Sequence, residues 1–183
     1  MGAEARRTAI LLLLGLGILA AQASAEPANG FGAGIGLVAN SYDLRHTGIS
    51  SSAGGGLIGD MQFVVNKKWS LNPYFTLSGE IADQKQTYAM NGVAGFEVRH
   101  WWGDQFLGVH LAAYSALVTR PGSSSNYYDP GAGISLGTER ASGFGYVLVL
   151  DLPRSLIPVA GLPVVDVNVR QEGVGFYLTY RFR

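Results

Sequence analysis

The chain has 183 residues, and its 13 Lys and Arg balance its 13 Asp and Glu, so the formal net charge is zero. This balance gives no electrostatic attraction to nucleic acid, and no basic tail or acidic run changes it. The absence of cysteine excludes disulfides, thiolate metal sites and a cysteine nucleophile.

The first 25 residues follow the order of a secretory signal peptide. Arg6 and Arg7 form a charged region, residues 9–20 form an apolar region, and residues 23–25 read Ala-Ser-Ala, an A-x-A cleavage site. The alternative is an uncleaved membrane helix, but the apolar run is shorter than the roughly 20 residues that a spanning helix needs. We therefore predict a signal peptide over residues 1–25 and one mature domain over residues 26–183.

The mature chain contains eight segments in which apolar and polar residues alternate. A period of two separates the two faces of a β-strand, and an even number of strands closes an antiparallel barrel in bacteria. The sequence therefore predicts an all-β fold, an eight-stranded antiparallel transmembrane up-and-down β-barrel. The expected strands are 29–42, 54–66, 70–82, 87–101, 105–119, 130–138, 143–152 and 172–183.

One face of nearly every expected strand is apolar throughout, which suits contact with lipid. In the last strand this face carries Val174, Phe176, Leu178, Tyr180 and Phe182. A transmembrane strand needs such a face because it presents hydrocarbon to hydrocarbon along its whole length. A soluble β-sandwich or lipocalin-like barrel is the alternative, and it would place polar residues outside.

The expected connections alternate in length, as they do in outer-membrane barrels. Short turns around residues 66–68, 103–104 and 139–140 are expected on the periplasmic side. The connections 43–53, 83–86, 120–129 and 153–171 are on average longer and are expected outside the cell. The three tryptophans, Trp69, Trp101 and Trp102, lie beside two of the short turns, where we expect a girdle of aromatic rings at the lipid interface.

The architecture of residues 29–183 resembles the small eight-stranded outer-membrane barrels, which include the OmpA transmembrane domain, OmpX and the lipid A enzymes PagP and PagL. Phe176, Leu178, Tyr180 and Phe182 are similar to the terminal signal that these proteins present to the barrel-insertion machinery, although Arg183 follows the last aromatic residue. The resemblance implies the outer membrane of a Gram-negative bacterium. It also implies two kinds of partner: outer-membrane lipids, including lipopolysaccharide, and the barrel-insertion machinery. It implies no nucleic acid partner.

The inward-facing residues predict two different regions of the lumen. In the lower half, Glu97, Arg99 and Arg181, with Asp60 above them, are expected to form a structural ion network, because a buried unpaired charge is costly. Such a plug argues against a pore for small solutes. In the upper half, small and apolar inward residues admit two interpretations. They leave a narrow apolar pocket for an acyl chain, or they make room for large neighbours such as Tyr114 and Tyr177.

Catalytic candidates are few. His110 is expected to face the lumen, but Ala112 and Ala113 follow it where enzymes similar to PagL carry a His-x-Ser-Asn pattern. His46 and Asp83 occupy the regions where enzymes similar to PagP carry their His and Asp-Ser residues, but Gln84 follows Asp83 where Ser is expected. A serine of the first loop, such as Ser51, is the remaining candidate. The residue patterns indicate no metal site and no cofactor.

The sequence therefore leaves two possible functions. The first is a non-enzymatic integral barrel with a structural or surface-interaction role. The second is an acyltransferase or deacylase acting on lipid A or phospholipid.

Overall fold

The computed structural model describes residues 26–44, 51–82, 87–120, 122–152 and 169–182, and these ranges form eight β-strands. The signal peptide expected over residues 1–25 lies outside them. No helix in these ranges is long and apolar enough to cross a membrane. The strands are β1 (Gly30–Leu44), β2 (Ser51–Asn66), β3 (Trp69–Ala82), β4 (Tyr88–Trp102), β5 (Gln105–Arg120), β6 (Ser123–Glu139), β7 (Phe144–Leu152) and β8 (Val169–Phe182).

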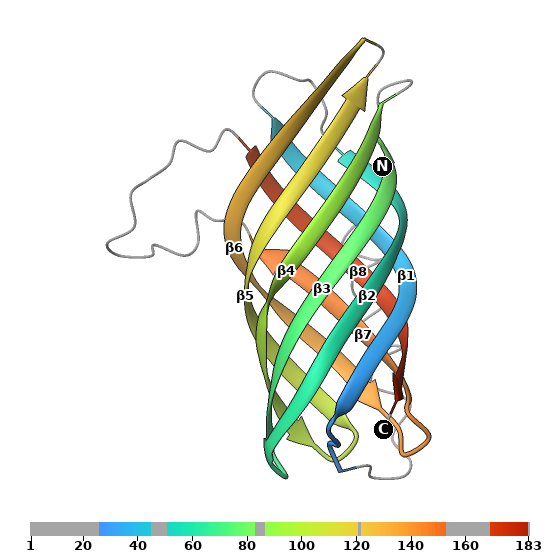
Figure 1. Ribbon diagram of the computed structural model, residues 1–183, viewed down its shortest axis with the longest axis vertical. Helices are drawn as coiled ribbons and strands as arrows, with labels where there is room; N and C mark the ends of the chain where they lie inside the picture. The colour runs from blue at the N-terminus through green and yellow to red at the C-terminus, as the bar shows by residue number, and fades with distance from the viewer. Residues whose placement is uncertain (1–25, 45–50, 83–86, 121, 153–168, 183) are drawn as a thin grey trace, which may run out of the picture.

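The strands form one closed antiparallel barrel in which each strand pairs with its sequence neighbours. The cylinder closes where β1 pairs with β8, from Phe31 opposite Phe182 to Leu44 opposite Val169. Figure 1 shows the strands tilted around the long axis of the cylinder. Closure leaves no free edge along the paired part of the wall, which is the requirement for a sheet in contact with hydrocarbon. The predicted fold class is confirmed.

The alternation of apolar and polar residues in the sequence appears in the barrel wall as an alternation of exposed and buried side chains. In β3 the outward side chains Leu71, Phe75 and Leu77 are exposed, whereas the inward Asn72 and Thr76 are buried. Other strands repeat the pattern, with exposed apolar residues such as Ile35, Met61, Phe96 and Val109. This arrangement reverses that of a protein folded in water, where the apolar face would be covered. The outside of the barrel is thus built for an apolar surrounding.

Seven strands begin and end within three residues of the predicted positions, and β6 is the exception. Residues 123–129 were predicted to belong to an extracellular connection, and this prediction is wrong. They extend β6 upward and pair with the upper end of β5, from Tyr114 opposite Asp129 to Arg120 opposite Ser123. The Ser-rich run suggests a loop by composition, but the ladder with β5 provides partners for its backbone groups.

The extension makes β5 and β6 a hairpin that projects above the rest of the barrel (Figure 1). On its other side, within the described residues, β6 pairs with β7 from Ala132 to Glu139. Pro130 lies two residues above the last of these pairs, and it has no backbone N–H to donate. Proline is tolerated where a strand has an edge, so its place fits the point at which the β6–β7 ladder ends.

Inward glycines make room for large side chains from neighbouring strands. A Cβ on Gly131 would meet the ring of Tyr114, and a Cβ on Gly175 would meet the ring of Tyr177. A Cβ on Gly133 would collide with the His110 ring and the Leu150 carbonyl. Of the two interpretations of the small upper-lumen residues, the structure fits the one in which they accommodate their neighbours.

We predict that Gly133→Ala destabilises the barrel by about 1–3 kcal/mol, because the added methyl group has no space between the two strands. Gly79→Ala is the matched control, since a Cβ there meets nothing within 4 Å, and surface changes usually stay within about 0.5 kcal/mol. Urea unfolding of both variants in lipid vesicles measures the difference. Equal stability of the two variants would contradict the packing described here.

Candidate functional site: the lumen

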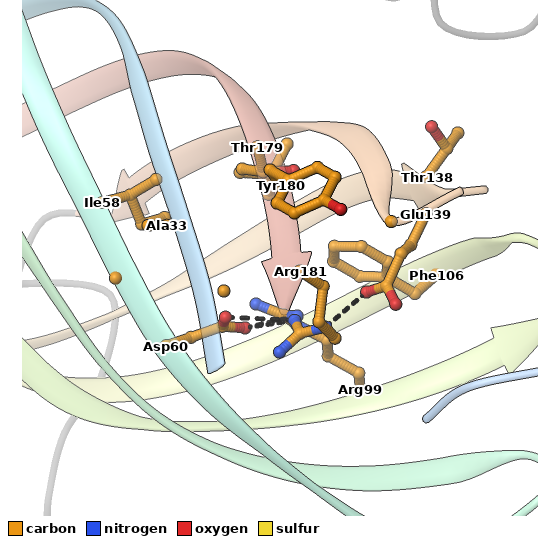
Figure 2. Close-up of a pocket in the computed structure, with 14 residues that line it drawn as sticks. Ala33, Ile58, Asp60, Arg99, Phe106, Thr138, Glu139, Thr179, Tyr180 and Arg181 are labelled. Atoms are coloured by element: carbon orange, nitrogen blue, oxygen red, sulfur yellow. Dashed lines mark hydrogen bonds and ion pairs between the residues drawn. The ribbon is translucent and has the colours of Figure 1, made fainter. Parts of the chain in front are cut away.

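The lower lumen holds five charged side chains in one ion network. Arg99 contacts Asp60 at 2.7 Å and Glu97 at 2.6 Å. Arg181 contacts Asp60 at 2.9 Å and Glu139 at 2.7 Å. Figure 2 shows Arg181 between the carboxylates of Asp60 and Glu139, with Arg99 beside them. The structure therefore brings together all four residues that the sequence suggested, and adds Glu139.

The five residues come from alternate strands of the wall. Asp60 lies on β2, Glu97 and Arg99 on β4, Glu139 on β6 and Arg181 on β8. Because inward side chains from alternate strands lie at the same level in a barrel, these strands supply one layer. Except for the Arg99–Glu97 pair within β4, each ion pair therefore joins strands that share no backbone hydrogen bonds. The network fastens the wall across the lumen as well as filling it.

Neutral side chains satisfy the polar atoms that the ion pairs leave. Asn72 donates to Asp60 at 3.2 Å and to Gln62 at 3.1 Å, and Ser70 donates to Asn72 at 2.8 Å. Ser135 donates to Glu97. The guanidinium of Arg99 also lies 4.3 Å from the centre of the Phe106 ring. A buried charge is tolerated when it is paired and hydrogen-bonded, and every charge of this layer is.

Trp101 belongs to the lumen, which corrects the prediction that all three tryptophans form a girdle. Its side chain is only 2% exposed, packs against Phe106 and donates through Nε1 to Ser70 at 2.9 Å. Trp69 and Trp102 do lie outside, where they flank the His100 ring at 4.6 and 5.8 Å between centroids. Adjacent residues of a strand point to opposite faces, so Trp101 and Trp102 cannot both face lipid.

The upper lumen is more polar than the sequence suggested. Glu80 is buried there and accepts hydrogen bonds from four neutral groups: Asn40 at 2.6 Å, Asn91 at 2.6 Å, Ser78 at 2.5 Å and the hydroxyl of Ser52. The narrow apolar pocket for an acyl chain is therefore not what these strands build. Period two in β3 places Glu80 on the same face as Asn72 and Tyr74, so the sequence does contain a signal for this residue.

His110 lies in a second polar cluster of the upper lumen. Its Nε2 is 3.1 Å from Asp151 Oδ1, and the Tyr114 hydroxyl donates to the same oxygen at 2.6 Å. The ring of Tyr74 packs edge-on against His110 at 5.2 Å. His110 is only 1% exposed, so no bulky substrate reaches it along the described strands.

Of the catalytic candidates, the described residues include only Ser51 and His110, and these two do not meet. His46 and Asp83 lie outside the described residues. Ser51 begins β2 and pairs with Ser41 of β1. The contacts of His110 within the described strands are with Asp151 and the two tyrosines, and none is with Ser51.

The four residues of the expected insertion signal lie on the outer face of β8. Leu178, Tyr180 and Phe182 are exposed, and Phe176 is half-buried. The Phe182 ring lies 6.3 Å from Phe31 and 5.0 Å from Tyr180. Their role in insertion remains a prediction.

A closed eight-stranded barrel with an apolar exterior and a filled, charged lumen is the architecture of the small outer-membrane β-barrels, and the chain has that fold. No protein-family model and no curated protein matches the sequence. Solved structures do match. One is Ail, the attachment invasion locus protein of Yersinia pestis, in complex with the heparin analogue sucrose octasulfate. Its TM-score is 0.59 and its sequence identity is 12%, and the match covers 85% of this chain and 100% of Ail. Another is Neisserial surface protein A, NspA, with a TM-score of 0.50 and 17% identity over 86% of this chain and 100% of that one.

We predict that Arg181→Met destabilises the barrel by about 3–5 kcal/mol, because it leaves Glu139 without its arginine and Asp60 with only one. The same vesicle unfolding assay measures the loss. Adding Glu139→Gln to Arg181→Met should recover part of it, since the double variant buries one negative charge fewer.

The control for this series is Lys67→Met. Lys67 forms a fully exposed ion pair with Glu26 at 2.7 Å, and this contact raises the pKa of Lys67. Exposed pairs are screened by water, so this variant should unfold like the wild type. A loss in Lys67→Met as large as that in Arg181→Met would contradict a special role for the lumen network.

Proposed function

We propose that the protein is a non-enzymatic integral barrel of the Gram-negative outer membrane, with a structural or surface-contact role. In this proposal residues 1–25 are removed as a signal peptide, and the outer face of β8 is recognised by the barrel-insertion machinery. The apolar side chains of the wall contact outer-membrane lipids, including lipopolysaccharide in the outer leaflet. The fold shared with Ail and NspA supports this location.

The single observation that carries the proposal is the contrast between the wall and the lumen. Exposed apolar residues cover the outside, and a satisfied ion network fills the lower lumen. The wall supports membrane residence, and the ion network across the lower lumen argues against a porin-like function. The acyltransferase alternative has no support in the described strands, since His110 meets an acid and two tyrosines there.

The projecting β5–β6 hairpin supports a role in surface contact. It continues beyond the end of the β6–β7 ladder, and its outward Ser124, Asn126 and Tyr128 are exposed, with Tyr128 at 70%. Tyrosine gives a large contact area at a small cost in conformational entropy, and serine and asparagine add hydrogen-bonding groups. Ail is named for attachment and was solved with a heparin analogue, so a surface role has a precedent in this fold.

Single-cysteine labelling tests location and orientation, because the chain has no cysteine of its own. We predict that Ser124→Cys reacts with a membrane-impermeant maleimide on intact cells. Asn66→Cys, at the end of β2 beside the β2–β3 turn and at the opposite end of the barrel, should react only after the outer membrane is permeabilised. The reverse pattern would overturn the orientation, and recovery of unlabelled protein in the soluble fraction would overturn membrane residence.

A shortened hairpin separates the structural role from the surface role. Joining Leu117 to Asn126, which face each other in the ladder, through a two-residue Asn-Gly turn removes the projection and keeps the register. If surface contact is the function, cells with this variant should lose adhesion to host matrix or heparin while keeping wild-type resistance to detergents. If the role is structural, the shortened barrel should restore detergent resistance to cells lacking the protein, and adhesion should not depend on the hairpin.

A further inference from the structure

The outer rim of the barrel beside the β2–β3 and β4–β5 turns carries an imidazole between two indoles. Trp69 begins β3, His100 stands opposite it on β4, and Trp102 ends β4 two residues further on. The centre of the His100 ring lies 4.6 Å from that of Trp69 and 5.8 Å from that of Trp102. The two indoles are 44% and 47% exposed, so the three rings form one group on the exterior of the wall.

The neighbouring rows of side chains place this group at the lower boundary of the apolar wall. The next outward row above it consists of Leu71, Val98 and Val109, which are exposed and lie in register across β3, β4 and β5. Below the group the chain turns back between the strands. Tryptophan is enriched at such boundaries, where its ring meets the headgroup layer of a bilayer. The headgroup of a lipid beside these strands therefore lies at the level of His100.

The two amide oxygens nearest to this group already accept hydrogen bonds. Asn66 Oδ1 accepts from the backbone N–H of Lys68 at 2.9 Å. Gln105 Oε1 accepts from the indole N–H of Trp102 at 2.9 Å. The rim therefore presents few free acceptors to a lipid headgroup.

Hydrogen-bond donors at this rim, in contrast, lack partners among the described residues. The contacts of His100 there are the two ring contacts, and neither its ring nitrogens nor the Trp69 indole N–H forms a hydrogen bond with a described residue. An indole only donates, and an imidazole donates through one nitrogen or both. The group therefore calls for a partner that accepts hydrogen bonds.

The charge at this rim is positive. Lys67 forms an ion pair with Glu26 at 2.7 Å, whereas the ammonium of Lys68 forms none with a described residue. The Lys68 carbonyl accepts from the backbone N–H of Trp101 at 2.8 Å, so Lys68 lies directly beside the ring group. The carboxylate of the adjoining β4–β5 turn, Asp104, is only 7% exposed. An unpaired cation thus stands next to unpartnered donors, and the partner that complements both is an anion.

We propose that this rim binds the phosphate of an anionic phospholipid in the periplasmic leaflet. The phosphate oxygens accept hydrogen bonds from Trp69 and His100, and the Lys68 ammonium supplies the opposite charge. One acyl chain lies along Leu71 and Val98. A phosphodiester carries a negative charge and accepts without donating, whereas water would leave the charge of Lys68 uncompensated. The inference rests on the membrane residence and orientation proposed above.

A lipid competition tests the site. The purified mature barrel, in neutral detergent, is offered equal amounts of phosphatidylglycerol and phosphatidylethanolamine with the same acyl chains, and native mass spectrometry counts the bound lipids. The wild type should retain phosphatidylglycerol preferentially. Lys68→Gln should reduce this preference about fivefold, the effect of one basic residue near an anionic lipid surface. Trp69→Phe should also reduce it, because it keeps an aromatic ring and removes the N–H donor.

Lys67→Gln is the matched control for charge. It removes the same charge from the same turn, but Lys67 is already paired with Glu26, so the lipid preference should remain. NMR spectra of the barrel with phosphatidylglycerol locate the lipid. They should show contacts between headgroup protons and the indole N–H of Trp69, and none with the indole N–H of Trp101, which is buried and bonded to Ser70.

Three results would overturn the proposal. The first is equal retention of the two lipids by the wild type. The second is an equal loss of preference in Lys67→Gln and Lys68→Gln, because a general effect of charge explains it. The third is a spectrum with no headgroup contact at Trp69. Reversed cysteine labelling would instead refute the proposed orientation and the periplasmic leaflet, and it would leave the lipid binding of the purified barrel unchanged.

Discussion

Closure of the sheet between β1 and β8 is the constraint on which the rest of this barrel depends. A strand in hydrocarbon must have its backbone groups paired, and only a closed ladder pairs them all without help from water. Closure then fixes two environments, because every second side chain points into an interior only eight strands wide. The outward residues can all be apolar. The inward residues must fill a narrow space and satisfy one another.

The sequence predicts the first of these environments, the lipid-facing exterior, almost completely. Period two is a local property, so it located seven strands to within three residues and identified the lipid face. The same period also determines two inward positions that were not predicted. Trp101 and Trp102 are neighbours on one strand and must face opposite sides, and Glu80 shares the inner face of β3 with Asn72. The upper half of β6 was missed because serine and asparagine favour loops by composition, whereas its pairing with β5 is a tertiary property.

The second environment, the lumen, depends on the register between neighbouring strands, which the sequence of a single strand does not specify. The contact between His110 and Asp151 requires that His110 stand opposite Gly133 and Gly133 opposite Asp151. A slip of one residue at either ladder would turn one of these side chains outward. Glu139 joined the ion network for the same reason: its position near the β6–β7 turn suggested solvent, and only the alignment of β6 with β8 brings it to Arg181. Residue types thus predicted an ion network, but not all of its members.

The two halves of the lumen differ in what compensates their buried charge. Below, arginines reach across from alternate strands, so the same contacts that neutralise the carboxylates also brace the wall. Above, Glu80 and Asp151 are held by amides, hydroxyls and one imidazole, which stabilise a carboxylate without cancelling its charge. The lower layer thus depends on two arginine side chains, whereas the upper carboxylates share their stabilisation among several neutral donors from different strands.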